Sequence, residues 1–104
     1  MTSKSKAKGN AYESELVRQA KSYDLQAVRA WGSDGRSLGQ HEGVDLIIEG
    51  RLVQAKRRAK IADYIIPNDD VDIQVIRADR GKSFAILRYD DYLQLLQQLK
   101  GQTP

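Results

Sequence analysis

The chain has 104 residues, 40% apolar and 30% charged, which is the composition of an ordinary folded domain. It contains no cysteine, which excludes a disulfide framework, thiolate metal sites and a cysteine nucleophile. No apolar run approaches the roughly 20 residues of a membrane span, and the first ten residues lack the apolar segment of a secretory signal. We therefore expect no membrane partner and a cytoplasmic location, in a prokaryotic cell or inside the host of a virus.

The net charge of +3 is equal to the contribution of Lys4, Lys6 and Lys8. Residues 1–9 are small, polar and basic, which predicts a flexible arm, and residues 10–101 are expected to form a single domain. A second group of cations follows in the middle of the chain: Lys56, Arg57, Arg58 and Lys60. Such a pattern fits a polyanionic partner such as nucleic acid, and an ordinary solvated charged surface is the alternative reading.

The first predicted element is a helix that begins at Asn10. Asn10 is placed as the N-cap and Glu13 as the third helical residue, the arrangement of a capping box. Apolar residues recur with helical spacing as far as Tyr23, where the helix should end. Residues 25–31 can form a strand, and residues 32–43, with four glycines, predict a loop.

Two apolar strands, residues 44–48 and 51–56, come next and are joined by a turn at Glu49-Gly50. The remaining elements are a short helix or turn-rich crossover, an alternating strand, a continuously apolar strand expected to be buried, and an amphipathic helix ended by Gly101: residues 60–69, 71–77, 83–88 and 89–100. The order α-β-β-β-α-β-β-α predicts an α/β fold in which a mixed five-stranded sheet is flanked by helices.

A two-residue turn would decide which side chains meet across the first hairpin. Counting outward from the turn, Ile48 lies opposite Arg51, and Asp45 lies opposite Gln54 with Cβ atoms roughly 5 Å apart. Lys56 projects from the same face two residues later. A carboxylate, an amide oxygen and an ammonium group therefore converge, as a site for metal-assisted hydrolysis requires.

Oxygen donors of this kind suit Mg²⁺, for which Mn²⁺ can substitute. Asp45 would supply an anionic oxygen and Gln54 a neutral one, while Lys56 would orient the attacking water or steady the charge of the transition state. Glu13 would reach the metal, directly or through water, if the first helix packs over the open end of the sheet. Structural readings stay open as well, with Glu13 as a capping glutamate and Gln54 and Lys56 as residues of an exposed strand face, whereas an aspartate in an apolar strand is harder to explain by structure alone.

The order of these residues carries a resemblance to a known family. Glu13 on the first helix, then GVD ending in Asp45, then QAK ending in Lys56, resembles the PD-(D/E)xK nuclease superfamily. Small Holliday junction resolvases of archaea and phages are the most similar in size, and their start resembles residues 8–17. The resemblance implies a restriction-endonuclease-like core, Mg²⁺ dependence and a homodimer that cuts branched DNA, with the four-way junction as the first substrate.

The resemblance also assigns roles, and one residue departs from the pattern. Glu13, Asp45, Gln54 and Lys56 take the places of the helix acid, the two strand acids and the lysine. Gln54 stands where the family has Asp or Glu, which removes a negative charge beside the ion and should weaken metal binding. Glutamine at this place resembles Mrr-type nucleases. An Mrr-like duplex endonuclease, a DNA-binding module with weak turnover and a partner-binding protein therefore stay open as alternatives.

Several side chains outside this group are candidates for contact with the DNA backbone. They lie at the helix start, around the glycine-rich loop and after the second strand of the hairpin: Lys8, Arg29, Ser33, Arg36, Arg57 and Arg58. His41, the only histidine, lacks the partner histidine of a zinc helix and is expected to contact solvent or phosphate.

Overall fold

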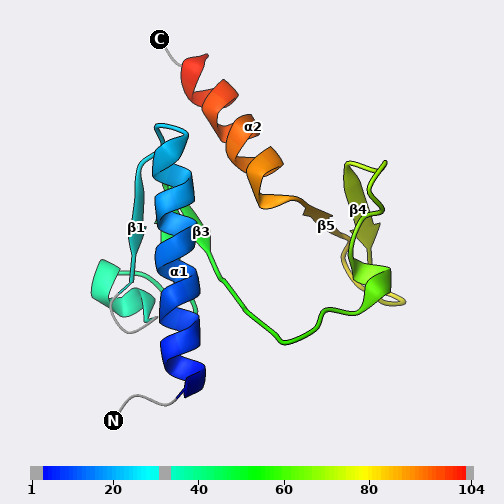
Figure 1. Ribbon diagram of the computed structural model, residues 1–104, viewed down its shortest axis with the longest axis horizontal. Helices are drawn as coiled ribbons and strands as arrows, with labels where there is room; N and C mark the ends of the chain where they lie inside the picture. The colour runs from blue at the N-terminus through cyan, green and yellow to red at the C-terminus, as the bar shows by residue number, and fades with distance from the viewer. Residues whose placement is uncertain (1–3, 31–33, 103–104) are drawn as a thin grey trace.

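The computed structural model describes residues 4–30 and 34–102 of this α/β protein. The elements follow one another in the predicted order, with a 3-10 helix in the crossover (Figure 1). They are α1 (Lys4–Ser22), β1 (Ala27–Arg29), the 3-10 helix η2 (Gly35–Leu38), β2 (Leu46–Ile48), β3 (Arg51–Val53), the 3-10 helix η3 (Asp63–Ile65), β4 (Ile73–Ile76), β5 (Phe84–Leu87) and α2 (Tyr89–Gly101).

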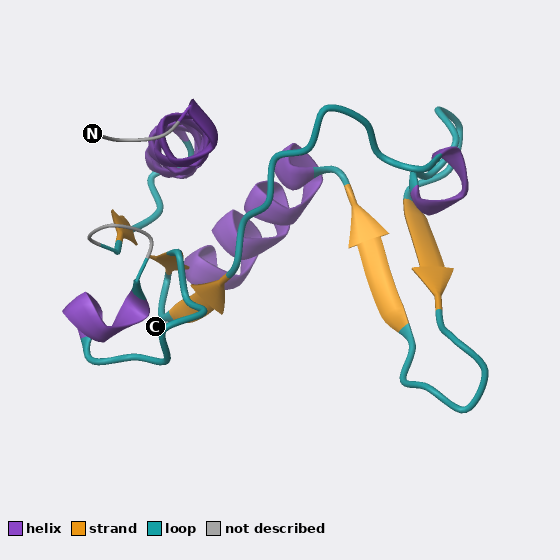
Figure 2. Ribbon diagram, turned by 90° about the horizontal axis from the view of Figure 1, so that it is seen from below, coloured by secondary structure: helices purple, strands orange, loops and turns teal. Residues whose placement is uncertain are grey.

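The strands form two antiparallel sheets instead of the single mixed sheet that the sequence predicts. β1, β2 and β3 make a three-stranded sheet in that order, and β4 pairs with β5 in a separate hairpin. Figures 1 and 2 both show this hairpin projecting from the rest of the molecule. Parallel pairing onto β3 needs a long crossover, usually a helix that covers the sheet. The described segment between β3 and β4 contains only the three-residue η3 as helix, which is too short for that purpose.

α1 begins six residues earlier than predicted. It starts at Lys4, so Asn10 lies inside the helix and is not its N-cap, and residues 4–9 are helical where a flexible arm was expected. Lysine and alanine are good helix formers, which favours this extension toward the N-terminus. The predicted end of the helix is confirmed: α1 ends at Ser22, and Asp24, two residues later, takes a left-handed conformation with φ 60°.

The first hairpin has the predicted two-residue turn. Glu49 and Gly50 both have positive φ, 47° and 79°, as a type I′ turn requires. The pairs Ile48–Arg51, Ile47–Leu52 and Leu46–Val53 follow in the predicted register. The register is therefore determined by local sequence, through the turn and the period of two.

Both helices cover the same face of the three-stranded sheet. The buried apolar cluster joins α1, the connection before β1, β2 and α2: Leu16, Ala20, Leu25, Leu46, Ile48, Leu93 and Leu96. The row formed by Val28, Ile47 and Leu52 lies on the other face, because these residues pair with one another and alternate with the buried positions. Val28 is 46% exposed and Leu52 is 54% exposed, so this face stays open.

Three polar contacts hold α2 against α1 and the turn that follows it. The Tyr89 hydroxyl donates to the Leu16 carbonyl at 2.7 Å, Gln97 Nε2 donates to the Tyr23 carbonyl at 3.2 Å, and Lys100 Nζ donates to the Asp24 carbonyl. Burial raises the pKa of Tyr89 from its ordinary value of 10.0 to about 12. These contacts anchor α2 along its whole length.

β5 is not buried, which corrects another expectation. Phe84 at its start is 67% exposed, and Val75 opposite Ala85 on β4 is 64% exposed. The predicted burial assumed a sheet with layers on both sides, and the hairpin instead stands apart from the layers (Figure 2). Several of its apolar side chains, including Ile73, Val75 and Phe84, are therefore exposed to solvent.

Candidate functional site

Asp45 is buried at the entrance to β2, where it is 8% exposed. Its N–H donates to the Val53 carbonyl at 2.9 Å, and its own carbonyl accepts from the Ala30 N–H at 2.8 Å. The Asp45 carboxylate accepts from the Ala55 N–H through Oδ2 at 2.7 Å. The side chain thus takes the place of a backbone carbonyl and continues the pairing past the end of β3.

This arrangement modifies the predicted contact between Asp45 and Gln54. The backbone ladder ends at Leu46–Val53, one pair before the expected Asp45–Gln54 pair. The carboxylate is nevertheless held beside the segment that carries Gln54, because it binds the N–H of the next residue. Gln54 and Lys56 are both exposed, at alternate positions after β3.

The loop before Asp45 folds over toward Gln54. The Gly43 N–H donates to His41 Nδ1 at 2.9 Å, and the Val44 N–H donates to the His41 carbonyl at 3.0 Å. A Cβ placed on Gly43 would lie 3.1 Å from His41 Nδ1 and 3.7 Å from Gln54 Nε2. His41 and Gln54 therefore flank the same glycine next to Asp45. His41 is not among the site residues expected from the sequence. Its position four residues before Asp45 is the signal that could have indicated its proximity to the site.

Gly35 shows why this loop closes so tightly. A Cβ on Gly35 would overlap the His41 carbonyl oxygen and the Val44 Cβ, so glycine is required there by close approach. The loop is therefore packed onto the start of β2.

Glu13 is buried against Arg29 instead of facing solvent. It is 3% exposed, and its Oε2 lies 3.8 Å from Arg29 NH1. That nitrogen is buried and has no hydrogen-bond partner in the described part of the chain. Arg29 sits opposite Leu46, the residue after Asp45, so this ion pair lies one strand away from the buried aspartate. The structure thus couples Glu13 to a residue that we expected to contact DNA.

Of the other residues expected to contact DNA, Arg36 is paired with an acid, whereas Arg57 and Arg58 are exposed. Arg36 forms a two-pronged pair with Asp34 inside the loop, with Nε–Oδ2 at 2.9 Å and NH2–Oδ2 at 2.6 Å, and this pair lowers the pKa of Asp34. Arg57 and Arg58 are exposed on the extended segment after Lys56, and Arg58 NH1 donates to the Arg57 carbonyl at 3.2 Å. Lys8 lies in α1, and Ser33 lies outside the described residues.

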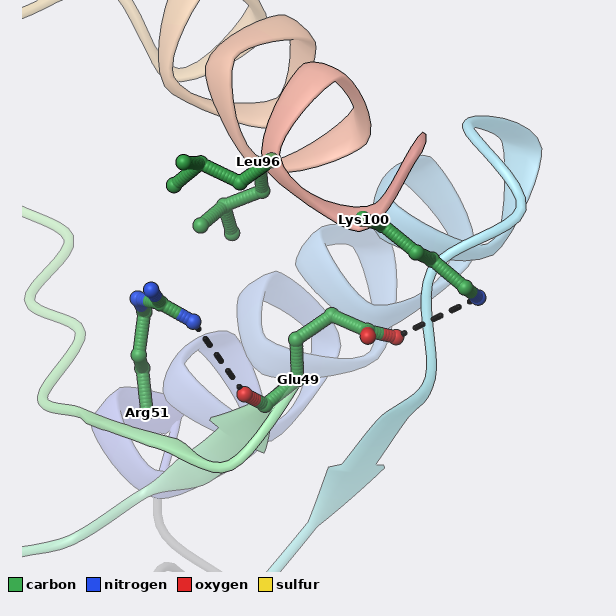
Figure 3. Close-up of a pocket in the computed structure, with 5 residues that line it drawn as sticks. Glu49, Arg51, Leu96 and Lys100 are labelled. Carbon is green, nitrogen blue, oxygen red and sulfur yellow. Dashed lines mark hydrogen bonds and ion pairs between the residues drawn. The ribbon is translucent and has the colours of Figure 1, made fainter. Parts of the chain in front are cut away.

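A pocket at the other end of the sheet is lined by residues that stabilise the fold (Figure 3). It lies between the β2–β3 turn and α2: Glu49, Arg51, Leu96, Leu99 and Lys100. The Glu49 carboxylate accepts from the Gln26 N–H and lies 3.5 Å from Lys100 Nζ, while Arg51 NH1 donates to the Glu49 carbonyl at 3.3 Å. These charged groups engage one another, and they tie the turn to α2.

The donor set near Asp45 is suited in kind to a hard cation. In the described ranges, no three side chains of His, Cys, Asp or Glu come together as a metal site. The available donors are one buried carboxylate and an exposed amide oxygen, which are the oxygen ligands that Mg²⁺ takes. Mg²⁺ commonly uses one or two carboxylates and completes its shell with water and substrate phosphate. The residues present therefore fit a weakly held Mg²⁺ better than a tight structural ion.

Comparison of the chain with protein-family models, with curated proteins and with solved structures finds no match. Neither helix within the described residues has the length and apolar character needed to cross a bilayer.

Proposed function

We propose that this chain is a Mg²⁺-dependent endodeoxyribonuclease of the PD-(D/E)xK type, with a restriction-endonuclease-like fold. The observation that carries the proposal is the hydrogen bond from the Ala55 N–H to the Asp45 carboxylate. It holds an anionic oxygen beside the extended segment after β3 that carries Gln54 and Lys56. The order of helices and strands and the confirmed hairpin register support the same assignment.

In this proposal Asp45 and Gln54 would hold the metal, and Glu13 would contribute directly or through water. A bound Mg²⁺ would supply a water of lowered pKa and positive charge beside the phosphate that is cut, as in other metal-assisted hydrolyses. Lys56 orients the attacking water. The basic segment formed by Lys56, Arg57, Arg58 and Lys60 binds the phosphates that flank the cut, because it is exposed and follows the site directly.

We propose branched DNA as the substrate, with a four-way junction first, and a homodimer as the acting form, in the cytoplasm of a cell. A two-fold protein presents two cutting sites to a nearly two-fold junction. An Mrr-like cutter of duplex DNA is a related alternative.

A DNA-binding module with weak turnover is the second candidate. It is favoured by the ion pair between Glu13 and Arg29, which neutralises the helix acid, and by the neutral amide of Gln54. Of the proposed metal-binding residues Glu13, Asp45 and Gln54, only Asp45 then keeps a negative charge without a cationic partner among the described side chains, which favours weak metal binding.

The direct test is incubation of the protein with four-way, duplex and single-stranded DNA, with and without Mg²⁺. We expect cleavage of the four-way junction only with Mg²⁺. Lys56→Ala should lower the rate by about 100-fold or more, since it removes the group that positions the attacking water. Its fold should be unchanged because Lys56 is exposed. Wild-type rates in this variant would contradict the role of Lys56, and metal-independent cutting would contradict the mechanism.

Calorimetric titration with Mg²⁺ separates the nuclease from the inert module. Gln54→Glu adds a carboxylate beside Asp45 and should tighten Mg²⁺ binding, while Gln40→Glu, in the exposed loop, is a matched control. Weaker Mg²⁺ binding in Gln54→Glu would show that Gln54 is not a ligand. Unimpaired DNA binding by a wild-type protein that binds no Mg²⁺ would favour the inert module.

A further inference from the structure

The described molecule exposes much more surface than a compact chain of its mass. Its accessible surface is 8125 Å². A compact monomer of 11.7 kDa is expected to expose roughly 5,900 Å². The radius of gyration is 15.1 Å, against about 13 Å for a compact domain of this length. The excess area, on the order of 2,000 Å², is what one partner contributes to a large permanent dimer interface.

Much of the exposed apolar surface belongs to the β4–β5 hairpin. Ile73 is 48% exposed, Val75 64% and Phe84 67%, so both of its faces present apolar side chains to water. A two-stranded hairpin alone is marginally stable in water. This hairpin therefore needs a surface to pack on.

The three-stranded sheet offers such a surface at β3. β3 is the edge of its sheet, so one side of its backbone is open to a further strand. Leu52, in the middle of β3, is 54% exposed beside the open row of Val28 and Ile47.

The contacts at the base of the hairpin hold it away from its own β3. Arg88, directly after β5, donates to the Val71 carbonyl and to the Asn68 carbonyl, each at 3.0 Å. The next residue, Tyr89, is bonded to Leu16 of α1. Both strands of the hairpin are thus tied to the start of α2, and α2 is tied to α1. A second copy of the chain can supply the missing strand without breaking these bonds.

Charge indicates the direction of pairing. Exposed acids precede β4: Asp69, Asp70 and Asp72. The basic segment follows β3, so antiparallel pairing of β4 with β3 brings the acidic end of one strand to the basic end of the other. Parallel pairing would place the acids beside the turn at Gly50 instead.

We propose that two copies of this chain exchange their β4–β5 hairpins, with β4 of each copy pairing antiparallel to β3 of the other. Each sheet then has five strands in the order β1-β2-β3, followed by β4 and β5 of the second copy. A two-fold axis makes the contact twice, so the open backbone edges of β3 and β4 are paired in both halves of the dimer. This inference stands on surface and charge, and it does not depend on catalysis. In the dimer Arg57 and Arg58 pair with the acids of the second copy, which leaves Lys56 and Lys60 of the basic segment for the DNA phosphates.

Light scattering coupled to gel filtration tests the exchange with neither DNA nor metal present. The full chain should run as a dimer. Val75→Asp should raise the dimer dissociation constant by at least about tenfold. Leu99→Asp, a substitution at a similarly exposed leucine of α2, should change it by less than about threefold. A monomer at all concentrations, or a dimer broken by Leu99→Asp and not by Val75→Asp, would overturn the proposal.

Val75→Asp could weaken the dimer simply by unfolding the hairpin, so a second test exchanges charges at the proposed contact. The double change Arg57→Glu with Arg58→Glu alters only exposed residues and should weaken the dimer. Adding Asp69→Lys with Asp70→Lys to the same chain should restore it. A dimer dissociation constant that stays the same through both changes would exclude the antiparallel β3–β4 contact, because that contact is the one proposed to bring these charges together.

Discussion

At the scale of single residues, Asp45 combines a structural and a chemical role. Its carboxylate accepts the Ala55 N–H and so replaces a missing backbone acceptor where the ladder ends. An aspartate in an apolar strand is otherwise unfavourable, and this bond explains how the fold tolerates it. The same bond orients the carboxylate beside Gln54, which makes Asp45 the residue on which the proposed site depends most.

Substitution of Asp45 separates these two roles. Asp45→Ala leaves the Ala55 N–H without its acceptor and should lower the free energy of unfolding by about 1–3 kcal/mol. Asp45→Asn keeps an oxygen acceptor and should lose less stability, although it removes the charge that binds metal. Urea denaturation and Mg²⁺ titration measure the two effects. Equal loss of stability in both variants would show that the hydrogen bond is not what the side chain contributes.

At the scale of elements, the β2–β3 turn is fastened to α2 through Glu49. The pKa of Glu49 lies below its ordinary value of 4.5, first because its carboxylate accepts the Gln26 N–H and then because Lys100 is close. A carboxyl whose pKa is lowered by folding stabilises the folded state fully above its unfolded pKa. That stability is lost as the pH falls through the folded pKa.

Glu49→Gln should therefore be less stable than the wild type at pH 7, and the difference should close as the pH falls below 4.5. The amide can still accept the Gln26 N–H, so the loss reflects the charge that pairs with Lys100. Thermal melts between pH 3 and pH 7 measure the difference, with Glu15→Gln on the exposed side of α1 as the control. A difference that persists unchanged at pH 3 would contradict the ionic contribution.

At the scale of the whole molecule, the packing of the two helices on the three-stranded sheet leaves the β4–β5 hairpin without a covering layer. One layer of helices covers one face of the three-stranded sheet, and the β4–β5 hairpin lies beyond it (Figure 1). The hairpin carries exposed apolar side chains. A chain with this much uncovered surface should gain stability from association, because a partner that binds only the folded form shifts the folding equilibrium.

The melting temperature of the wild type should therefore rise with protein concentration. A hundredfold change in concentration should produce a clear shift, since dissociation and unfolding are linked. Val75→Asp should show a flat dependence if the hairpin makes the contact. Calorimetry or circular dichroism across this range measures it, and a wild-type midpoint that is independent of concentration would argue for a stable monomer.

Much of the local structure could be predicted because it depends on neighbours in the chain. The turn at Glu49-Gly50 and the alternation of β2 and β3 determine the hairpin register, and the apolar spacing of residues 89–100 determines α2. The predicted start of α1 at Asn10 was wrong. A capping signal at Asn10 competed with the good helix formers before it, and the helix begins at Lys4.

The sequence alone determined the order of the elements, the pairing of β2 with β3 and the proximity of Asp45 to the segment that carries Gln54. These follow from periodicity and turn geometry, which act over a few residues. Only the tertiary structure decided that Glu13 is buried against Arg29 and that the β4–β5 hairpin stands apart from β3. Such contacts join segments far apart in the chain, and their free energy depends on packing and desolvation that no local pattern encodes.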